Sequence, residues 1–314
     1  MFRSSSQAFI ALVLLASRFL AVHNAQAQVV ISNNDGWATA QIRAQFDALT
    51  EKGYDAFLSA PALKQSGKGS YTTTPEVLTE PCQFDTCPVG SPPFGYNASD
   101  SRLNYVNAYP ANAANYGVNV ISPRFTNGHP PDLLVSGPDI GPNVGFLTQY
   151  SGTVGAASAA SLQNIPAAAF SGVSGAQVSY TTLTSDPYAN STIAARIYSD
   201  LTVHFVGTLF EAIDIGLPII LPRAVIVNVN YGSIIGCGRP GDYKWVFARN
   251  RKDDSAVDAL MCDDYLPTEL EVLRSQGCYV SVSALDAETK TDVDAGTQAL
   301  VMMKLHFLPW SCLE

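Results

Sequence analysis

Residues 29–60 read VVISNNDGWATAQIRAQFDALTEKGYDAFLSA and contain the pattern that decides the fold class. The nearly unbroken apolar run Val29 to Ser32 predicts a buried strand, and Asp55 to Ala60 predicts a second one. The stretch between them, Ala38 to Lys52, predicts a helix that stops at Gly53. The apolar face of this helix carries Ile42, Phe46 and Leu49. A strand, a helix and a second strand in succession predict a parallel pair of strands.

The same alternation continues along the chain, without an internal repeat or a long linker. Further buried strands are expected at Asp132 to Ser136, Ala167 to Ser171, Ala224 to Asn230 and Tyr279 to Leu285. Helices are expected over Thr153 to Gln163, a segment of small residues that can pack closely on a sheet, and over Asn190 to Ile215. The expected fold class is therefore α/β with a mostly parallel central sheet.

The N-terminus has the composition of an export signal. Arg3 gives a positive start, the apolar run Ala8 to Ala16 is too short to span a bilayer, and Ala25-Gln26-Ala27 offers small residues for cleavage. The alternative is an N-terminal anchor or a buried first helix, which the polar pair His23-Asn24 disfavours. We therefore expect residues 1–27 to be a signal peptide and the mature protein to be secreted.

Charge limits the partners of the chain. It has 18 Lys and Arg residues against 27 Asp and Glu residues, a formal net charge of −9. Nucleic acid polymers and anionic membranes need clustered Lys and Arg, so neither is an expected partner. No second apolar stretch is long enough for a transmembrane helix. We expect residues 28–314 to form a single domain, with a core over about 28–236 and a C-terminal extension over about 237–314.

All six cysteines follow the expected cleavage site. An even number in an exported chain favours disulfides over metal ligands or a reactive thiol, and six cysteines allow fifteen pairings. Proximity alone favours Cys82 with Cys87, Cys237 with Cys262, and Cys278 with Cys312. The sequons Asn97-Ala98-Ser99 and Asn190-Ser191-Thr192 are sites for glycans in a eukaryotic secretory pathway, which would make the protein a glycoprotein with both asparagines facing solvent.

Two stretches break the alternation of strands and helices. Tyr71 to Asn104 is rich in Pro, Thr, Ser and Cys, which predicts an inserted hairpin or loop that is pinned by a disulfide and rims a site. The chain after Cys237 is irregular, and its strands are expected to form an extension that embraces a second subunit. Residues 236–241 formally match GxGxxG, but Pro240 and the strand-like Tyr243 to Phe247 favour a disulfide-pinned turn over a dinucleotide site.

Polar residues follow the predicted strands. In an open α/β sheet, ligands bind beyond the carboxyl ends of the strands. The first strand runs into Asn33-Asn34-Asp35-Gly36, the second leads to Ser66-Gly67, and the third runs into Asp139. Tyr150-Ser151-Gly152-Thr153 opens the helix of small residues. We expect these four segments to meet at one edge of the sheet.

The residue types in these segments suit a hard cation. Asn34, Asp35, Ser66 and Asp139 offer carboxylate, amide and hydroxyl oxygens, which favour magnesium, manganese or calcium over zinc. Such an ion would neutralise a phosphoryl group and lower the pKa of an attacking water. The N–H groups that open the helix at Ser151 would hold phosphate oxygens. The alternative for Asn33 to Gly36 is ordinary turn and N-cap chemistry before a helix.

Several motifs in a fixed order carry a more specific signal. They are Ser32 to Trp37, Ser66-Gly67, Ser136 to Gly145, Tyr150 to Val154, Leu221-Pro222 and Asn228-Val229-Asn230. This set resembles the SurE (survival protein E) family, phosphatases also called 5'/3'-nucleotidases, and in particular its secreted fungal members described as acid phosphatases. The resemblance covers most of the chain after the signal peptide. It implies a Rossmann-like three-layer sandwich, a homodimer or higher homo-oligomer with exchanged C-terminal elements, and one divalent metal ion, Mg or Mn.

The resemblance also assigns roles to individual residues. The metal ligands it implies are Asn34, Asp35, Ser66 and Asp139, with Asp35 and Asn34 as the catalytic residues. The residues expected to bind phosphate are Asn33, Gly67, Ser151, Gly152 and Thr153. The family usually has Asp at the position of Asn34 and Asn at that of Asp139, so this chain exchanges carboxylate and amide between the two positions and keeps the formal ligand charge. The family also tends to have Asp where Asn112 stands.

Two functions from different classes follow. The first is a secreted, metal-dependent phosphomonoesterase that acts on a small phosphorylated substrate, with nucleoside 5'- and 3'-monophosphates as candidates. The alternative is a secreted binding protein on the same scaffold, whose catalysis has been impaired by the exchange at Asn34 and Asp139. The Walker A, HExxH and GxSxG motifs of other hydrolases do not occur in the chain.

Overall fold

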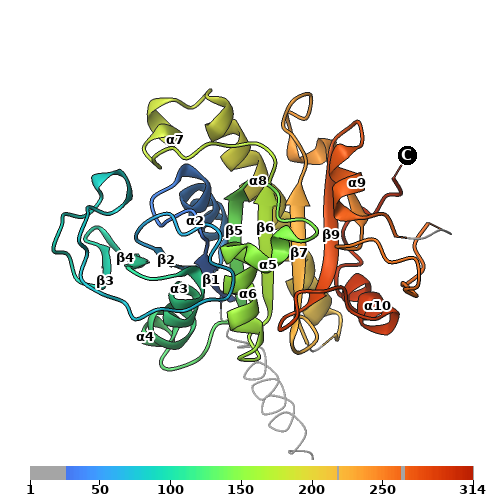
Figure 1. The fold of residues 1–314 in the computed structure, drawn as a ribbon, viewed down its shortest axis with the longest axis horizontal. Helices are drawn as coiled ribbons and strands as arrows, with labels where there is room; N and C mark the ends of the chain where they lie inside the picture. Colours follow the sequence, from blue (N-terminus) through green and yellow to red (C-terminus); the bar gives the residue numbers. More distant parts are fainter. Residues whose placement is uncertain (1–25, 218, 263–265, 314) are drawn as a thin grey trace, which may run out of the picture.

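The computed structural model describes residues 26–217, 219–262 and 266–313, so most of the expected signal peptide lies outside the described residues. In this part of the chain, nine strands form one sheet in the order β3-β4-β2-β1-β5-β6-β7-β9-β8 (Figure 1). The strands are β1 (Gln28–Ser32), β2 (Asp55–Pro61), β3 (Phe94–Asn97), β4 (Asp100–Val106), β5 (Leu133–Ile140), β6 (Ala167–Gly172), β7 (Val225–Tyr231), β8 (Lys244–Phe247) and β9 (Tyr279–Asp286).

Six neighbouring strands run parallel and make up most of the sheet. β4, β2, β1, β5, β6 and β7 pair in the same direction. β3 is antiparallel to β4, β9 is antiparallel to β7, and β8 is parallel to β9. The predicted α/β class with a mostly parallel sheet is therefore confirmed.

Helices cover both faces of the sheet, which explains why its strands are apolar on both sides. The helices are α2 (Ala40–Lys52), α3 (Pro110–Tyr116), α4 (Ser122–Phe125), α5 (Leu147–Tyr150), α6 (Gly152–Ser161), α7 (Thr182–Ser185), α8 (Asn190–Asp214), α9 (Glu269–Arg274) and α10 (Ala295–Lys304). Val29 and Ile31 of β1 belong to the core that holds the apolar faces of α2 and α8. Val30, between them, packs with α3 and α6 on the opposite face, the one turned to the viewer in Figure 1.

The helix boundaries follow local chemistry. Gly53 ends α2 with a left-handed φ of 101° that favours glycine, as its sequence position predicts. The N-terminus of α2 lies at Ala40 rather than Ala38, because Thr39 is extended and forms a bridge with Ser179. In α6, the side chain of Ser151 caps the helix by accepting the N–H of Val154.

The stretch Tyr71 to Asn104 contains the predicted hairpin, but the hairpin is part of the sheet. β3 and β4 form an antiparallel pair, and β4 then runs parallel to β2, with Leu103 opposite Leu58. Helix α3, which begins with Pro110, follows this insertion and was not predicted. After Cys237, β8 and β9 pair within the sheet of their own chain, and the expectation that this region embraces a second subunit stays a prediction.

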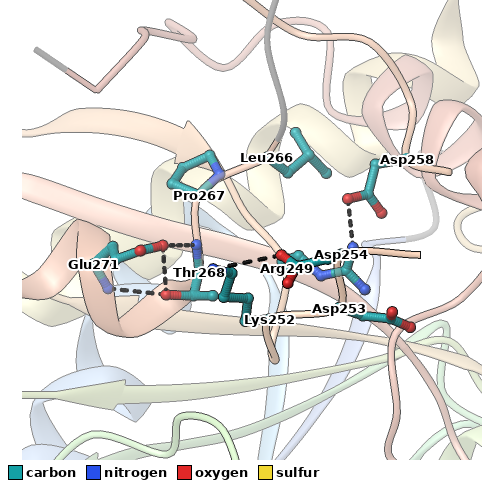
Figure 2. A pocket seen from close by; sticks show the side chains of 9 residues that line it. All are labelled: Arg249, Lys252, Asp253, Asp254, Asp258, Leu266, Pro267, Thr268 and Glu271. Carbon is teal, nitrogen blue, oxygen red and sulfur yellow. Dashed lines mark hydrogen bonds and ion pairs between the residues drawn. The ribbon is translucent and has the colours of Figure 1, made fainter. Parts of the chain in front are cut away.

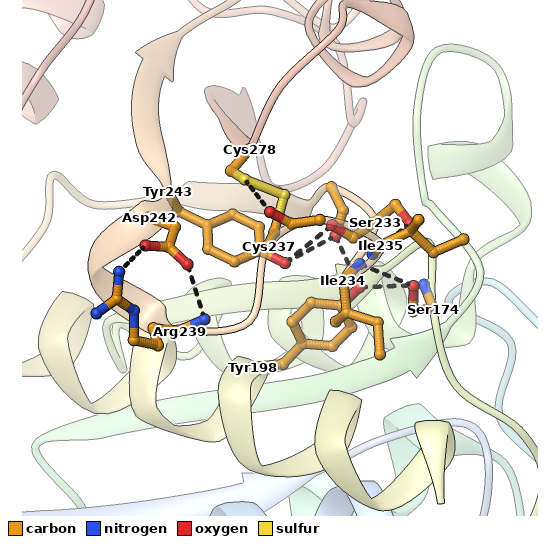
Figure 3. Close-up of a disulfide and its surroundings, with 12 residues drawn as sticks. Ser174, Tyr198, Ser233, Ile234, Ile235, Cys237, Arg239, Asp242, Tyr243 and Cys278 are labelled. Carbon is orange, nitrogen blue, oxygen red and sulfur yellow. Dashed lines mark hydrogen bonds and ion pairs between the residues drawn. A yellow bond between two sulfur atoms is a disulfide. The ribbon is translucent and has the colours of Figure 1, made fainter.

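The structure contains three disulfides, and two of the predicted pairings are wrong. Cys82 pairs with Cys87 as predicted, whereas Cys237 pairs with Cys278 and Cys262 with Cys312. Tyr231 of β7 lies opposite Val280 of antiparallel β9, so the segment after β7 and the segment before β9 meet at one end of the sheet. Cys237 and Cys278 join these two segments (Figure 3). The GxGxxG-like stretch is the predicted disulfide-pinned turn, with a single 3-10 turn over Pro240–Asp242.

The length and hydropathy of the helices bear on membrane association. Among the described residues, none of the helices combines the length and apolar character needed to cross a bilayer. This result extends only to the part of the chain that the structure describes.

Candidate active site

The predicted site residues from β1 and β5 meet at the carboxyl ends of the two strands. β1 and β5 are neighbours, with Ser32 opposite Ser136. The Asn34 side chain, just beyond β1, donates from Nδ2 to Oδ2 of Asp139 at 3.1 Å. These two residues, at which the resemblance implies an exchange of amide and carboxylate, therefore contact each other directly.

Asn33 shapes the loop after β1. Its Nδ2 donates to the carbonyl of Gly36 at 3.0 Å, and its Oδ1 accepts the N–H of Gly36 at 3.1 Å. Gly36 has a φ of 102°, in the left-handed region that favours glycine. The turn chemistry considered for this segment is thus present at Asn33, while phosphate binding by Asn33 stays a prediction.

Asp35 is a buried carboxylate, 1% exposed, held by groups from several parts of the chain. Its Oδ2 accepts the backbone N–H of Ile140 at 2.9 Å. Its Oδ1 accepts a hydrogen bond from Nε2 of Gln177 and lies 3.6 Å from Nζ of Lys64. These donors fix the carboxylate in one orientation.

Asp139 lies next to Asp35. Its Oδ2 accepts hydrogen bonds from Asn34 at 3.1 Å and from Nδ2 of Asn143 at 2.9 Å. Burial, and then the negative charge of Asp35, raises the pKa of Asp139 well above its usual range. Two neighbouring buried carboxyl groups favour a cation between them, because a cation reduces their mutual repulsion.

The oxygen atoms at this edge fit a hard divalent cation. Oδ1 of Asn34 is buried and has no hydrogen-bond partner among the described residues. Ser66 is exposed on the loop after β2, and the N–H of its neighbour Gln65 donates to the Asn34 carbonyl at 2.7 Å. Within the described ranges, no three His, Cys, Asp or Glu side chains gather to hold an ion, so a cation here would also need amide and hydroxyl oxygens.

The N-terminus of α6 lies against the same loop. A Cβ atom placed on Gly152 would lie 2.7 Å from Cγ of Pro110 and 2.9 Å from Cβ of Asn34, so only glycine allows this approach. Thr153 is buried, and its hydroxyl has no partner among the described groups. Gly67, with a φ of 77°, has open space beside it. The structure thus brings Ser151, Gly152 and Thr153 beside Asn34.

A second layer of polar side chains supports Asp139. The backbone N–H of Asn143 donates to Oδ1 of Asn230 at 2.8 Å, and its carbonyl accepts from Nδ2 of Asn228 at 2.8 Å. Asn228 also donates to Oε1 of Glu269 at 2.7 Å. Burial raises the pKa of Glu269 to about 8. A hydrogen-bonded path therefore runs from α9 to the candidate site.

Three groups that were not predicted from the sequence contact Asp35 or its backbone. Lys64 and Gln177 lie beside the carboxylate, and Gln83 donates to the Asp35 carbonyl at 2.8 Å. All three belong to connections outside the motifs. Lys64 lies two residues before the predicted ligand Ser66, so its position in the sequence indicates that it is near the site. No local pattern distinguishes Gln83 or Gln177.

The pocket drawn in Figure 2 is separate from the candidate site. It has a volume of about 450 Å³, and it is lined by Arg249, Lys252, Asp253, Asp254, Asp258, Leu266, Pro267, Thr268 and Glu271. Nη1 of Arg249 lies 2.6 Å from Oδ2 of Asp258, so its charge is balanced within the pocket wall. None of the predicted site residues lines this pocket, and we place the candidate site at the strand ends on chemical grounds.

Comparisons with known proteins show the family of the chain. The sequence model of the family "Survival protein SurE" matches residues 29–241. An "Acid phosphatase" of Yarrowia lipolytica is 33% identical over 305 residues, covering 87% of this chain and 81% of that protein. A "5'-nucleotidase SurE" of Lawsonia intracellularis is 27% identical over 209 residues, covering 66% of each chain.

One solved structure has a similar fold. The SurE protein from Aquifex aeolicus superposes with a TM-score of 0.57 at 22% sequence identity. The match covers 83% of this chain and 94% of that one. The family match over residues 29–241 and the 33% identity to the Yarrowia lipolytica protein show that the chain belongs to the SurE family.

Proposed function

We propose that this chain is a secreted, divalent-metal-dependent phosphomonoesterase that acts on small phosphate monoesters, nucleoside 5'- and 3'-monophosphates among them. The chain is an enzyme that hydrolyses phosphoric monoesters. One observation carries the metal-dependent part of the proposal. The buried carboxyl groups of Asp35 and Asp139 are neighbours, and Asn34, which contacts Asp139, has a buried Oδ1 without a hydrogen-bond partner among the described residues.

The residues that would hold the ion are Asn34, Asp35, Ser66 and Asp139. Their oxygen atoms suit Mg²⁺ or Mn²⁺ better than a soft metal. When bound, the ion would neutralise charge on the phosphoryl oxygens and lower the pKa of a water molecule. The exchanged positions keep two carboxylates in this set, as the usual family pattern does.

The chain's own groups bind the phosphate in this proposal. The first N–H groups of a helix lack intrahelical partners, so those of Gly152 and Thr153 are available for an anion. Ser151 keeps that turn in place, because its hydroxyl caps the helix. Gly67 offers open space for the substrate, and the half-exposed ammonium group of Lys64 adds positive charge. Asn33 contributes by setting the course of the loop.

Asp35 and Asn34 orient the attacking water. Asp35 is positioned to accept a hydrogen bond or a proton from water, since its carboxylate is already fixed by Ile140 and Gln177. Asn34 is an amide and not a base, so its role is to place the water through Oδ1. This division of roles follows from the exchange of Asn34 and Asp139.

The proposed compartment rests on two observations. Three disulfides among the six cysteines suit an oxidising environment. The N-terminal segment has the composition of a signal peptide. A homodimer is proposed from family membership alone.

Phosphate release titrated against Mn²⁺ and Mg²⁺ tests the proposal. We expect hydrolysis of p-nitrophenyl phosphate and of nucleoside monophosphates that saturates with metal and stops reversibly with chelator. Asp35→Ala and Asp139→Ala should each remove nearly all activity. Full activity in excess chelator would refute metal dependence, and metal binding without any phosphate release would instead support a binding protein.

A further inference from the structure

The disulfide-closed loop of the insertion reaches the candidate site. The Cys82–Cys87 disulfide closes a short loop that contains Gln83. The backbone N–H of Gln83 donates to the carbonyl of Ala62, just beyond β2, at 3.0 Å, and the N–H of Cys82 donates to the Cys87 carbonyl at 2.9 Å. The disulfide and the Cys82–Cys87 backbone hydrogen bond close the loop, and the hydrogen bond to Ala62 attaches it to the end of β2. Together these contacts constrain the position of Gln83.

The Gln83 amide joins two other parts of the chain. Its Nε2 donates to the backbone carbonyl of Asp35 at 2.8 Å and to Oε1 of Gln177 at 3.0 Å. Gln177 in turn donates from Nε2 to Oδ1 of Asp35. Gln83 and Gln177 therefore hold Asp35 at its backbone and at its carboxylate.

The Gln83 contact decides which end of the Gln177 amide faces Asp35. An amide presents a donor on one side and an acceptor on the other. Because Oε1 of Gln177 accepts from Gln83, its NH₂ group faces the carboxylate. If the Gln177 amide turned over, its oxygen would face the Asp35 carboxylate and its NH₂ group would face the Gln83 donor. Both contacts would then be repulsive, and Asp35 would lose a buried donor.

Gly36 leaves the space that this contact requires. A Cβ atom at Gly36 would collide with Oε1 of Gln83 and lie 2.9 Å from its Cδ. Oε1 of Gln83 is itself buried without a hydrogen-bond partner in the described part of the chain. Such a placement is costly for an amide oxygen, so the hydrogen bonds made by its NH₂ group must hold the side chain there.

We infer that Gln83 and Gln177 are positioning residues for Asp35, and that closure of the Cys82–Cys87 disulfide maintains the metal affinity of the site. This inference rests on the proposed metal-dependent function. Removing residues that orient a metal ligand typically lowers metal affinity about 10- to 100-fold. The predicted effect is therefore on binding of the ion rather than on the fold as a whole.

The experiment measures Mn²⁺ binding to the full chain by calorimetry, together with the thermal midpoint. We compare wild type, Gln83→Ala and the nearly isosteric Gln83→Glu. Gln163→Ala is the matched control, because Gln163 also bridges two segments through its amide, donating to Oδ1 of Asn115 at 2.7 Å, but at the far end of α6. Both Gln83 variants should bind Mn²⁺ about 10-fold more weakly or worse. Activity should return at high Mn²⁺, and the control should match wild type.

A second arm tests the disulfide. Cys82→Ser/Cys87→Ser should weaken Mn²⁺ binding like Gln83→Ala, whereas Cys262→Ser/Cys312→Ser, which opens a disulfide in the C-terminal region, should leave it within about 2-fold of wild type. Unchanged Mn²⁺ affinity in the Gln83 variants and in the Cys82→Ser/Cys87→Ser protein would overturn this inference and leave the proposed function intact. Failure of the wild-type protein to bind Mn²⁺ would overturn the proposed function and this inference together.

Discussion

Glu269 is a buried carboxyl group whose proton should control the stability of the fold. Its side chain at the start of α9 is 0% exposed. Oε1 accepts hydrogen bonds from Nδ2 of Asn228 at 2.7 Å and from the hydroxyl of Ser283 at 2.5 Å. Burial raises the pKa of Glu269 from its ordinary value of 4.5 to about 8, although these two hydrogen bonds oppose the shift.

The sign and size of the effect follow from linkage between proton binding and folding. Because the pKa of Glu269 is higher in the folded state, the stability it contributes is fully present below pH 4.5 and is lost as the pH rises through about 8. Each pH unit in that interval costs about 1.4 kcal/mol of unfolding free energy. At pH 7 the cost relative to pH 4.5 is therefore about 3 kcal/mol.

Glu269→Gln should remove this dependence on pH. The amide keeps a carbonyl oxygen for Asn228 and Ser283 but carries no titrating proton. Urea unfolding should find the variant equal to wild type near pH 4.5 and more stable by about 3 kcal/mol at pH 7. The matched control is Glu271→Gln, since the hydrogen bonds from Thr268 lower the pKa of Glu271 and reverse the sign. A constant difference between Glu269→Gln and wild type from pH 4.5 to 8 would refute the reasoning.

Three further predictions concern the site and the disulfides. The effects of Asn34→Asp and Asp139→Asn on Mn²⁺ affinity should not add, because the two side chains share a hydrogen bond and the proposed ion. Strictly additive effects, with no loss of affinity in Asp139→Asn, would show that Asp139 is not a ligand. Gly152→Ala should press its new methyl group against Asn34 and Pro110, which should destabilise the fold by about 1–3 kcal/mol and reduce phosphate release. Wild-type kinetics in this variant would contradict the close approach of Gly152 to Asn34. Peptide mapping of the unreduced protein should find the three observed disulfides and no free thiol, and several free thiols would contradict the structure or the proposed export.

Local sequence patterns predicted the elements that position the site. Val29 to Ser32 is nearly unbroken in its apolar character, and Asp35 follows three residues after Ser32. Both the buried strand and the polar loop at its end are therefore visible in a short stretch of sequence. The motif order placed Asp139 and Ser151 at the same edge of the sheet. The structure confirms that Asp139 contacts Asn34 and that the helix capped by Ser151 packs beside Asn34. Their roles as ligands stay proposals.

The supporting contacts could not be predicted in the same way. Gln83 lies 48 residues from Asp35, and Gln177 lies 142 residues from it. Nothing beside Gln83 or Gln177 in the sequence indicates a partner so distant. Their roles become visible only when both loops reach the end of β1.

The sequence by itself determined the α/β class, the positions of the main buried strands along the chain and the residues at their carboxyl ends. It could do so because hydrophobic periodicity and turn chemistry act over a few residues. Only the tertiary structure decided that β9 returns antiparallel beside β7, which pairs Cys237 with Cys278, and that Gln83 and Gln177 close around Asp35. The physical reason is the distance along the chain over which each interaction acts. Strand direction and side-chain hydrogen bonds between distant loops depend on how the whole sheet packs. That packing cannot be predicted from the few residues around each position.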